Sequence, residues 1–166
     1  MYTEDEVIEL LKALPPECEF IDYKQTGYKK DKQGYFIKDV ISMLNAYTAY
    51  GRNRFIIIGV DDNRELVGIS EEEIRDDNEY QNWINKISPK PIVNTGQIKY
   101  GNKVFEIICI NKENDGQIYE LVQGVNIQPI HEGQTFYRQG SQNAVLTEEV
   151  RRKIRSSYFD ESKYRE

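Results

Sequence analysis

Apolar residues recur at helical spacing in four stretches of the chain. The first begins after Thr3, which forms a capping-box pattern with Glu6, and it ends before Pro15-Pro16. The second covers residues 36–47, where apolar side chains return every three or four positions. The last two patterns run from Ser70 to Pro89 and from Leu146 to Phe159. We therefore expect four amphipathic helices.

Between these helices, shorter patterns predict strands. Residues 17–24 alternate in polarity, which predicts a strand with Asp22 and Lys24 on one face. Residues 55–60 are continuously apolar, which is typical of a central strand covered on both faces. Gly101-Asn102 separates two apolar runs and predicts a hairpin. Further short strands are expected at residues 66–69, 117–122, 125–130 and 135–138.

This order of elements predicts one domain. We expect an α+β (mixed α/β) fold over residues 1–166, with its core at residues 4–156 and a mixed β-sheet flanked by helices. Cys18 and Cys109 form neither a disulfide framework nor a zinc pattern, so we expect a cytoplasmic protein. No apolar stretch is long enough to span a bilayer. His131 is the only histidine, which excludes sites that need two of them.

The formal net charge of -6 is unevenly distributed along the chain. Residues 24–54 contain seven basic and two acidic side chains, whereas residues 61–79 contain nine acidic and two basic ones. A further basic cluster lies at residues 151–155. A basic surface beside an acidic one suits a metal-dependent nuclease. The alternative is that these charges only form solvated surfaces of the protein, which is the more common case for any single run of charged residues.

Carboxylates follow or occupy two of the predicted strands. Glu17 and Asp22 belong to the first, and Asp61-Asp62 follow the apolar run at residues 55–60. If these strands are neighbours, Asp61 or Asp62 completes a three-carboxylate site that suits Mg²⁺ or Mn²⁺. Lys24 would then offset the charge that builds up on a phosphate. The alternatives are an ordinary ion pair on the strand and a simple turn.

Basic side chains with aromatic neighbours occur in two other blocks. Arg138 lies in Phe136–Ser141, where an arginine and a Gly-Ser turn suit phosphate and base contacts. The loop of Lys29, Lys30 and Lys32 is a candidate clamp for a nucleic-acid backbone. A structural arginine and a solvated loop remain the alternatives.

Taken in order, these blocks resemble the Schlafen-type AlbA_2 domain over roughly residues 4–156. Five segments carry the resemblance: Glu17 with Asp22-Tyr23-Lys24, Asn45-Ala46, Phe55–Asp62, Val67-Gly68-Ile69, and Tyr137–Ser141 followed by Thr147-Glu148-Glu149. Two departures stand out. Asp22 replaces the usual glutamate, and a longer segment at residues 47–54 replaces the common Asn-Thr-x-Gly-Gly turn.

The resemblance implies a metal-dependent endoribonuclease that cleaves structured RNA such as tRNA, with a possible toxin-like or anti-phage role. By position, it places metal on Glu17, Asp22 and Asp62, with Asp61 as the fallback, and gives Lys24 a catalytic role. The expected nucleic-acid contacts are Lys29, Lys30, Lys32, Lys38, Arg138 and Ser141.

Two other functions stay open at this point. A non-catalytic nucleic-acid-binding module, of a regulatory kind, would bind without divalent metal. A nucleotide-binding or protein-interaction domain ranks last, because the sequence contains no Walker loop and no Gly-x-Gly-x-x-Gly. The expected partner is RNA or single-stranded nucleic acid, and a homo-oligomer or a separate regulatory partner is compatible with either function. Residue types alone do not distinguish RNA from single-stranded DNA.

Overall fold

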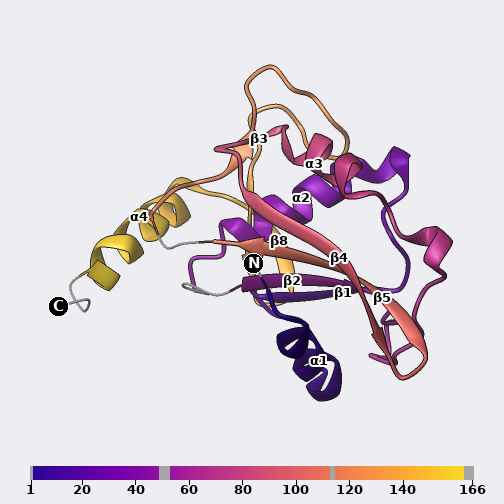
Figure 1. The fold of residues 1–166 in the computed structure, drawn as a ribbon. Helices are drawn as coiled ribbons and strands as arrows, with labels where there is room; N and C mark the ends of the chain where they lie inside the picture. The colour runs from indigo at the N-terminus through magenta and orange to yellow at the C-terminus, as the bar shows by residue number, and fades with distance from the viewer. Residues whose placement is uncertain (1, 49–52, 113–114, 163–166) are drawn as a thin grey trace.

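A four-stranded mixed sheet separates two groups of helices (Figure 1). The computed structural model of the chain describes residues 2–48, 53–112 and 115–162. The strands are β1 (Ile21–Lys24), β2 (Asn53–Ile58), β4 (Ile92–Tyr100) and β5 (Lys103–Asn111). Their spatial order is β1-β2-β5-β4, with β1 parallel to β2 and the other pairs antiparallel. The predicted mixed sheet and the central position of the apolar strand are both confirmed.

The parallel pair β1–β2 needs a crossover, and α2 (Gln33–Leu44) supplies it. Because successive strand residues face opposite sides, β2 contributes to two cores. Ile56 and Ile58 pack with α2, whereas Phe55 and Ile57 pack on the opposite face with α1 (Glu4–Ala13). All four side chains are buried. The sheet is therefore covered on both faces, as its continuous apolar run predicts.

The capping pattern predicted for the first helix is present in α1. The Thr3 hydroxyl accepts a hydrogen bond from the Glu6 backbone N–H at 3.1 Å. The helix ends at Leu14, which adopts the left-handed conformation with φ of 42°. Val7 and Leu11, one turn apart, are buried against the sheet. The predicted extent of this helix is confirmed.

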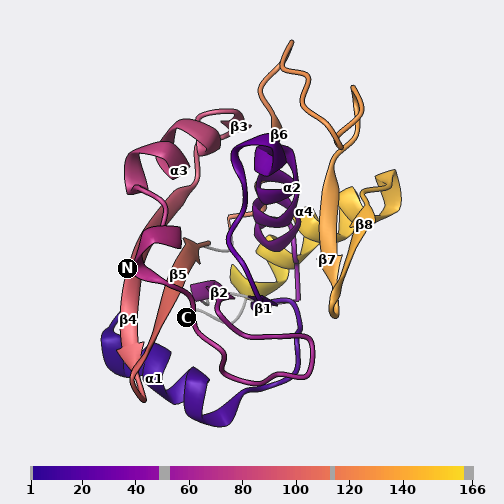
Figure 2. The same cartoon turned by 90° about the vertical axis from the view of Figure 1, so that its right-hand side faces the viewer.

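The remaining elements are shorter, apart from the last helix. They are η1 (Lys30–Lys32), η2 (Glu71–Glu73), α3 (Asp77–Ile84), β3 (Ile87–Ser88), β6 (Glu120–Leu121), β7 (Phe136–Gln139), β8 (Gln142–Val145) and α4 (Glu148–Ser162). Figure 2 shows the β7–β8 hairpin beside α2, against which β7 packs. No helix in the described parts of the chain is both long and apolar enough to cross a membrane.

Two predicted elements differ from the structure. The strand expected from Glu17 begins only at Ile21, because the Cys18 N–H bonds to the Ile21 carbonyl at 3.1 Å and closes a turn. The helix expected over residues 70–89 is split. The capping box at Ser70 starts only the single turn η2, and α3 begins separately after Asp76, whose side chain caps it.

Three smaller differences complete the comparison. The strands expected at residues 66–69 and 125–130 are reduced to isolated bridges, and β8 was not predicted as a strand. Part of the long segment at residues 47–54 lies outside the described residues.

Candidate functional site

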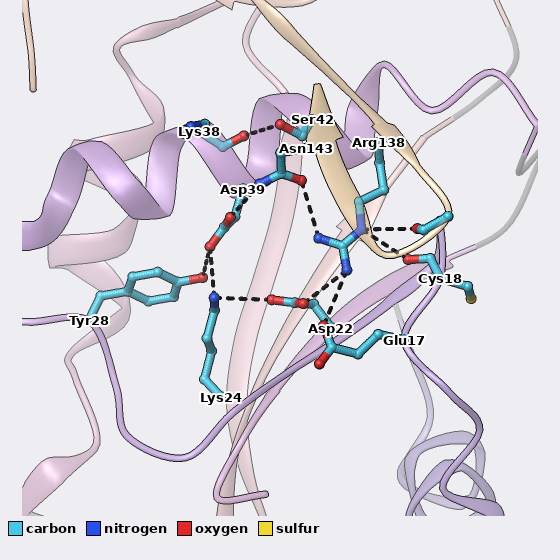
Figure 3. Close-up of polar contacts among 11 residues, drawn as sticks. Glu17, Cys18, Asp22, Lys24, Tyr28, Lys38, Asp39, Ser42, Arg138 and Asn143 are labelled. Carbon is cyan, nitrogen blue, oxygen red and sulfur yellow. Dashed lines mark hydrogen bonds and ion pairs between the residues drawn. The ribbon is translucent and has the colours of Figure 1, made fainter. Parts of the chain in front are cut away.

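A buried ion pair joins β1 to the β7–β8 hairpin. Asp22 lies on the face of β1 that points toward α2, and only 3% of its surface is exposed. Arg138 Nη2 donates to Asp22 Oδ1 at 2.9 Å. The guanidinium also donates to the backbone carbonyls of Cys18 and Gly140 and to the side chain of Asn143 (Figure 3). Arg138 is therefore enclosed by protein acceptors.

Lys24 lies between two carboxylates. Its Nζ is 3.4 Å from Asp22 Oδ2 and 3.5 Å from Asp39 Oδ2. Burial alone would lower the pKa of Lys24, but these two carboxylates raise it, so the amine is held as a cation. Asp39 comes from α2 and also accepts hydrogen bonds from the Tyr28 hydroxyl at 2.5 Å and from Asn143 at 2.8 Å. Figure 3 shows this second half of the network.

Asp39 was not predicted from the sequence. Asp39 is one of two acids in the basic segment at residues 24–54, and only 7% of its surface is exposed. A usable signal was its position on α2. Phe36 precedes it by three residues and Met43 follows it by four, so Asp39 shares their buried helix face. An acid on the apolar face of a helix needs a partner, and Lys24 is that partner.

Glu17 lies at the edge of this network, 3.5 Å from Arg138 Nη2. Burial, together with the adjacent Asp22, raises the pKa of Glu17 to about 7. Burial would also raise the pKa of Asp22, but a hydrogen bond with Glu17 and the charges of Lys24 and Arg138 lower it. In the folded protein Glu17 therefore binds a proton at a higher pH than its neighbour Asp22 does.

The third expected metal ligand, Asp62, and its fallback Asp61 lie in an exposed or partly exposed turn after β2. Asp61 Oδ1 accepts hydrogen bonds from the backbone N–H groups of Asn63 and Glu65, at 3.0 and 2.8 Å. No hydrogen bond or ion pair among the described residues joins either aspartate to Glu17.

As arranged, these carboxylates do not fit a divalent metal. Within residues 2–48, 53–112 and 115–162, no three His, Cys, Asp or Glu side chains are grouped to hold a metal ion. Two cations, Lys24 and Arg138, already neutralise Asp22. A dication at Asp22 would therefore face two positive charges instead of an open carboxylate cluster.

Lys24 connects the charged network to a groove on the surface. This lysine groove has a volume of about 360 Å³. Its lining residues are Lys24, Thr26, Gly27, Tyr28, Lys29, Lys32 and Tyr35. Lys29, Lys30 and Lys32 are exposed, and Lys32 Nζ lies 5.1 Å from the centre of the Tyr35 ring. The predicted lysine loop is thus open to solvent.

The remaining expected nucleic-acid contacts differ in accessibility. Lys38 on α2 is partly buried, with Nζ 4.7 Å from the centre of the Phe136 ring. Ser141 is exposed in the turn between β7 and β8. Arg138 is 4% exposed. The structure thus brings together Glu17, Asp22, Lys24 and Arg138 as one network, with the open lysines beside it.

Comparisons with known proteins concern the same part of the chain. A family profile described as Schlafen, AlbA_2 matches residues 17–147. A search of curated proteins gave no match. The DIP2311 protein from Corynebacterium diphtheriae is similar in structure at 15% sequence identity and a TM-score of 0.53, over 86% of this chain and 26% of that one. The chain thus spans about a quarter of that protein's length.

A second solved structure is the N-terminal domain of an ATP-dependent DNA helicase RecG-related protein from Nitrosomonas europaea. It matches at 15% identity and a TM-score of 0.46, over 89% of this chain and 97% of that one. At such identities a structural likeness concerns the fold alone. The profile match is more specific, since it begins at Glu17 and ends after the β7–β8 hairpin that carries Arg138.

Proposed function

Since the chain belongs to the Schlafen AlbA_2 family, a membership that indicates a nucleic-acid-related function, we propose that it is a nucleic-acid-binding module that holds a sugar-phosphate backbone in its lysine groove. The lysine groove carries this proposal. All of the charged residues that line it are lysines, and no carboxylate lines it. In a chain of net charge -6, such a cationic concavity is a local exception.

The lysines of this groove divide into two kinds. Lys29 and Lys32 form no ion pair among the described residues, so their charges are available to phosphates. Lys24 is 36% exposed and is held by Asp22 and Asp39 at a fixed position. Arg138 would act indirectly, as a positioning residue that fixes Asp22 and through it Lys24.

The test is the affinity of the triple variant Lys29→Gln, Lys30→Gln, Lys32→Gln for labelled RNA in EDTA, measured by fluorescence anisotropy. Each phosphate contact to single-stranded nucleic acid contributes about 0.7 to the slope of log affinity against log salt. Losing the contacts of Lys29 and Lys32, which line the groove, and of Lys30, an exposed neighbour in the same loop, should weaken binding and reduce that slope by about 2.

A matched control removes the same charge elsewhere. Lys12, Lys90 and Lys99 are also exposed, on α1, before β4 and on β4, and none of them lines the groove. The triple variant Lys12→Gln, Lys90→Gln, Lys99→Gln should bind nearly as the wild type does. Equal losses in both triple variants would mean that overall charge, and not the groove, governs binding.

A second candidate is a metal-dependent endoribonuclease that cleaves structured RNA with Mg²⁺ or Mn²⁺. The observation that favours it is the Glu17–Asp22 pair beside Lys24. Burial and Asp22 raise the pKa of Glu17 there to about 7, and Asp22 Oδ2 is a buried oxygen that lies 3.4 Å from the Lys24 ammonium. This function needs a further metal ligand to join the pair, for which Asp62 or Asp61 is the candidate by position in the family.

Incubation of tRNA and single-stranded DNA with the protein, in Mn²⁺ or in EDTA, separates the two candidates. Asp22→Asn and Glu17→Gln are the appropriate variants, because the Asn amide oxygen can still accept the hydrogen bond from Arg138, whereas Asp22→Ala would remove that acceptor. Cleavage that requires Mn²⁺ and is lost in both variants would support the nuclease. Binding without cleavage, at the same affinity in EDTA, would leave the binding module as the function.

A further inference from the structure

We infer that the lysine groove selects an unpaired nucleotide, whose base stacks on Tyr35 while its phosphates lie against Lys29 and Lys32. This inference rests on the proposed function and specifies its ligand as single-stranded nucleic acid. It assigns a role to the Tyr35 ring, which is exposed to solvent. Three features of the groove support it: the exposure of Tyr35, the rigidity of Tyr28, and the size of the groove.

Tyr35 lies in the first turn of α2 and is 47% exposed. Among the side chains that the structure describes, it is the one exposed Phe, Tyr or Trp ring. The other large exposed apolar side chains are aliphatic: Val67, Ile92, Val122 and Val145. An exposed ring beside cations is the combination that binds single strands, because every base offers a π-face to stack on.

Another part of the groove lining, Tyr28, is held in place by the protein. Tyr28 is 8% exposed, and its hydroxyl is bound to Asp39. The guanidinium of Arg75 donates to the Tyr28 backbone carbonyl. Tyr28 is therefore a fixed part of the lining, and Tyr35, whose ring centre lies 5.1 Å from Lys32 Nζ, is the ring that is exposed for stacking. A groove formed before binding loses less conformational entropy when a ligand enters.

The size of the groove favours one nucleotide over a duplex. Its 360 Å³ lie at the small end of ligand sites, which measure roughly 300–1,000 Å³. A duplex keeps its bases paired and stacked, so it presents phosphates to the lysines and no base face to Tyr35. An unpaired nucleotide can make both contacts at once. The Tyr35 ring therefore favours single strands over duplexes, which the lysines alone cannot do.

The experiment compares Tyr35→Ala, Tyr35→Phe and the wild type in EDTA, by fluorescence anisotropy. The probes are a short single-stranded RNA, the same sequence as single-stranded DNA, and the RNA annealed to its complement. Ile92→Ala is the control, because Ile92 is an exposed apolar side chain on β4 outside the groove. Loss of stacking should weaken single-strand binding about tenfold in Tyr35→Ala.

In Tyr35→Phe the ring is kept, so affinity for single strands should stay near that of the wild type, as it should in Ile92→Ala. Duplex binding should be weaker than single-strand binding and unchanged by Tyr35→Ala. Equal affinities for single strand and duplex, or an unaffected Tyr35→Ala, would overturn the inference while the proposed function stands. Absence of binding to every probe would overturn both. The RNA and DNA arms show whether the 2′-hydroxyl contributes.

Discussion

Arg138 connects the two ends of the family-matched segment through its side chain. It bonds to Asp22 and to the carbonyl of Cys18, positions 116 and 120 residues earlier. Both charged groups are almost fully buried. Removing one partner of a buried pair costs about 3–5 kcal/mol of stability, and loss of Arg138 would leave Asp22 with Lys24 as its remaining cationic partner among the described residues.

We therefore expect Arg138→Met to lower the free energy of unfolding by about 3–5 kcal/mol, as measured by urea denaturation. Arg155→Met is the control, because the Arg155 side chain is 56% exposed and should change stability by less than about 0.5 kcal/mol. Adding Asp22→Asn to Arg138→Met should restore part of the loss, since the buried charge is then removed. Similar stability in the two single variants would contradict this account of the pair.

Glu17 makes the stability depend on pH. Burial raises the pKa of Glu17 from 4.5 to about 7 in the folded protein, so between these values the folded state holds a proton that the unfolded state has lost. Stability should thus fall as pH rises from 4.5 to 7. Glu17→Gln removes this titration and should flatten the decline, as measured by urea unfolding across that range.

The size of the Glu17 effect is reduced by solvent, because the side chain is 39% exposed. Glu9→Gln, which removes a carboxyl group from an exposed position of α1, should keep the wild-type decline. A Glu17→Gln variant that declines as steeply as the wild type would show that the proton resides elsewhere in the network.

At the scale of elements, the position of α2 depends on a glycine. A Cβ atom on Gly34 would lie 1.7 Å from the backbone oxygen of Gln128, so the helix can approach that segment only without a side chain. Alanine normally favours a helix over glycine by about 1 kcal/mol. Here the overlap should reverse the sign, and Gly34→Ala should destabilise the protein by about 2 kcal/mol in thermal or urea unfolding.

Gly27→Ala provides the matched control for that substitution. A Cβ atom at Gly27 would meet no atom closer than 3.8 Å, so the same chemical change should be tolerated there. If Gly34→Ala were stabilising, helix propensity would outweigh the packing of α2 on the segment around Gln128.

Elements that form from local patterns were predicted, and those set by distant contacts were not. β2 follows from its apolar run. The β4–β5 hairpin follows from Gly101-Asn102, whose φ angles of 57° and 66° this pair of residues tolerates. The break after η2 depends instead on Glu106, a residue of β5 that accepts a hydrogen bond from the Arg75 N–H. The short polar strand β8 offers no alternation to detect.

The candidate site was predictable to the same degree. Strand periodicity places Asp22 and Lys24 on one face, and the structure confirms this. The enclosure of Arg138 was not evident, because a strand pattern does not say what covers its face. Asp62 was expected beside the cluster on the basis of neighbouring strands. β1 and β2 are neighbours, but among the described residues no hydrogen bond or ion pair joins the turn that contains Asp62 to Glu17.

At the scale of the molecule, opposite charges are placed side by side. The acidic segment at residues 61–79 contacts the lysine groove, since Arg75 binds the Tyr28 carbonyl and Gly27 lies near the backbone of Glu73. A polyanion that enters the groove would thus meet attraction on the lysine side and repulsion on the acidic side. If the groove binds a strand as proposed, we expect this asymmetry to limit the direction in which the strand leaves it.

The distance in sequence between Asp22 and Arg138 has a consequence for how the protein is made. A ribosome releases β1 and α2 long before the β7–β8 hairpin. During synthesis Asp22 can therefore pair with Lys24 before Arg138 is available. The hairpin can bind β1 through Arg138 only after residue 138 has emerged from the ribosome. The Asp22–Arg138 pair can therefore form only after the hairpin has been synthesised, and a fragment that stops before the hairpin would carry Asp22 without this arginine.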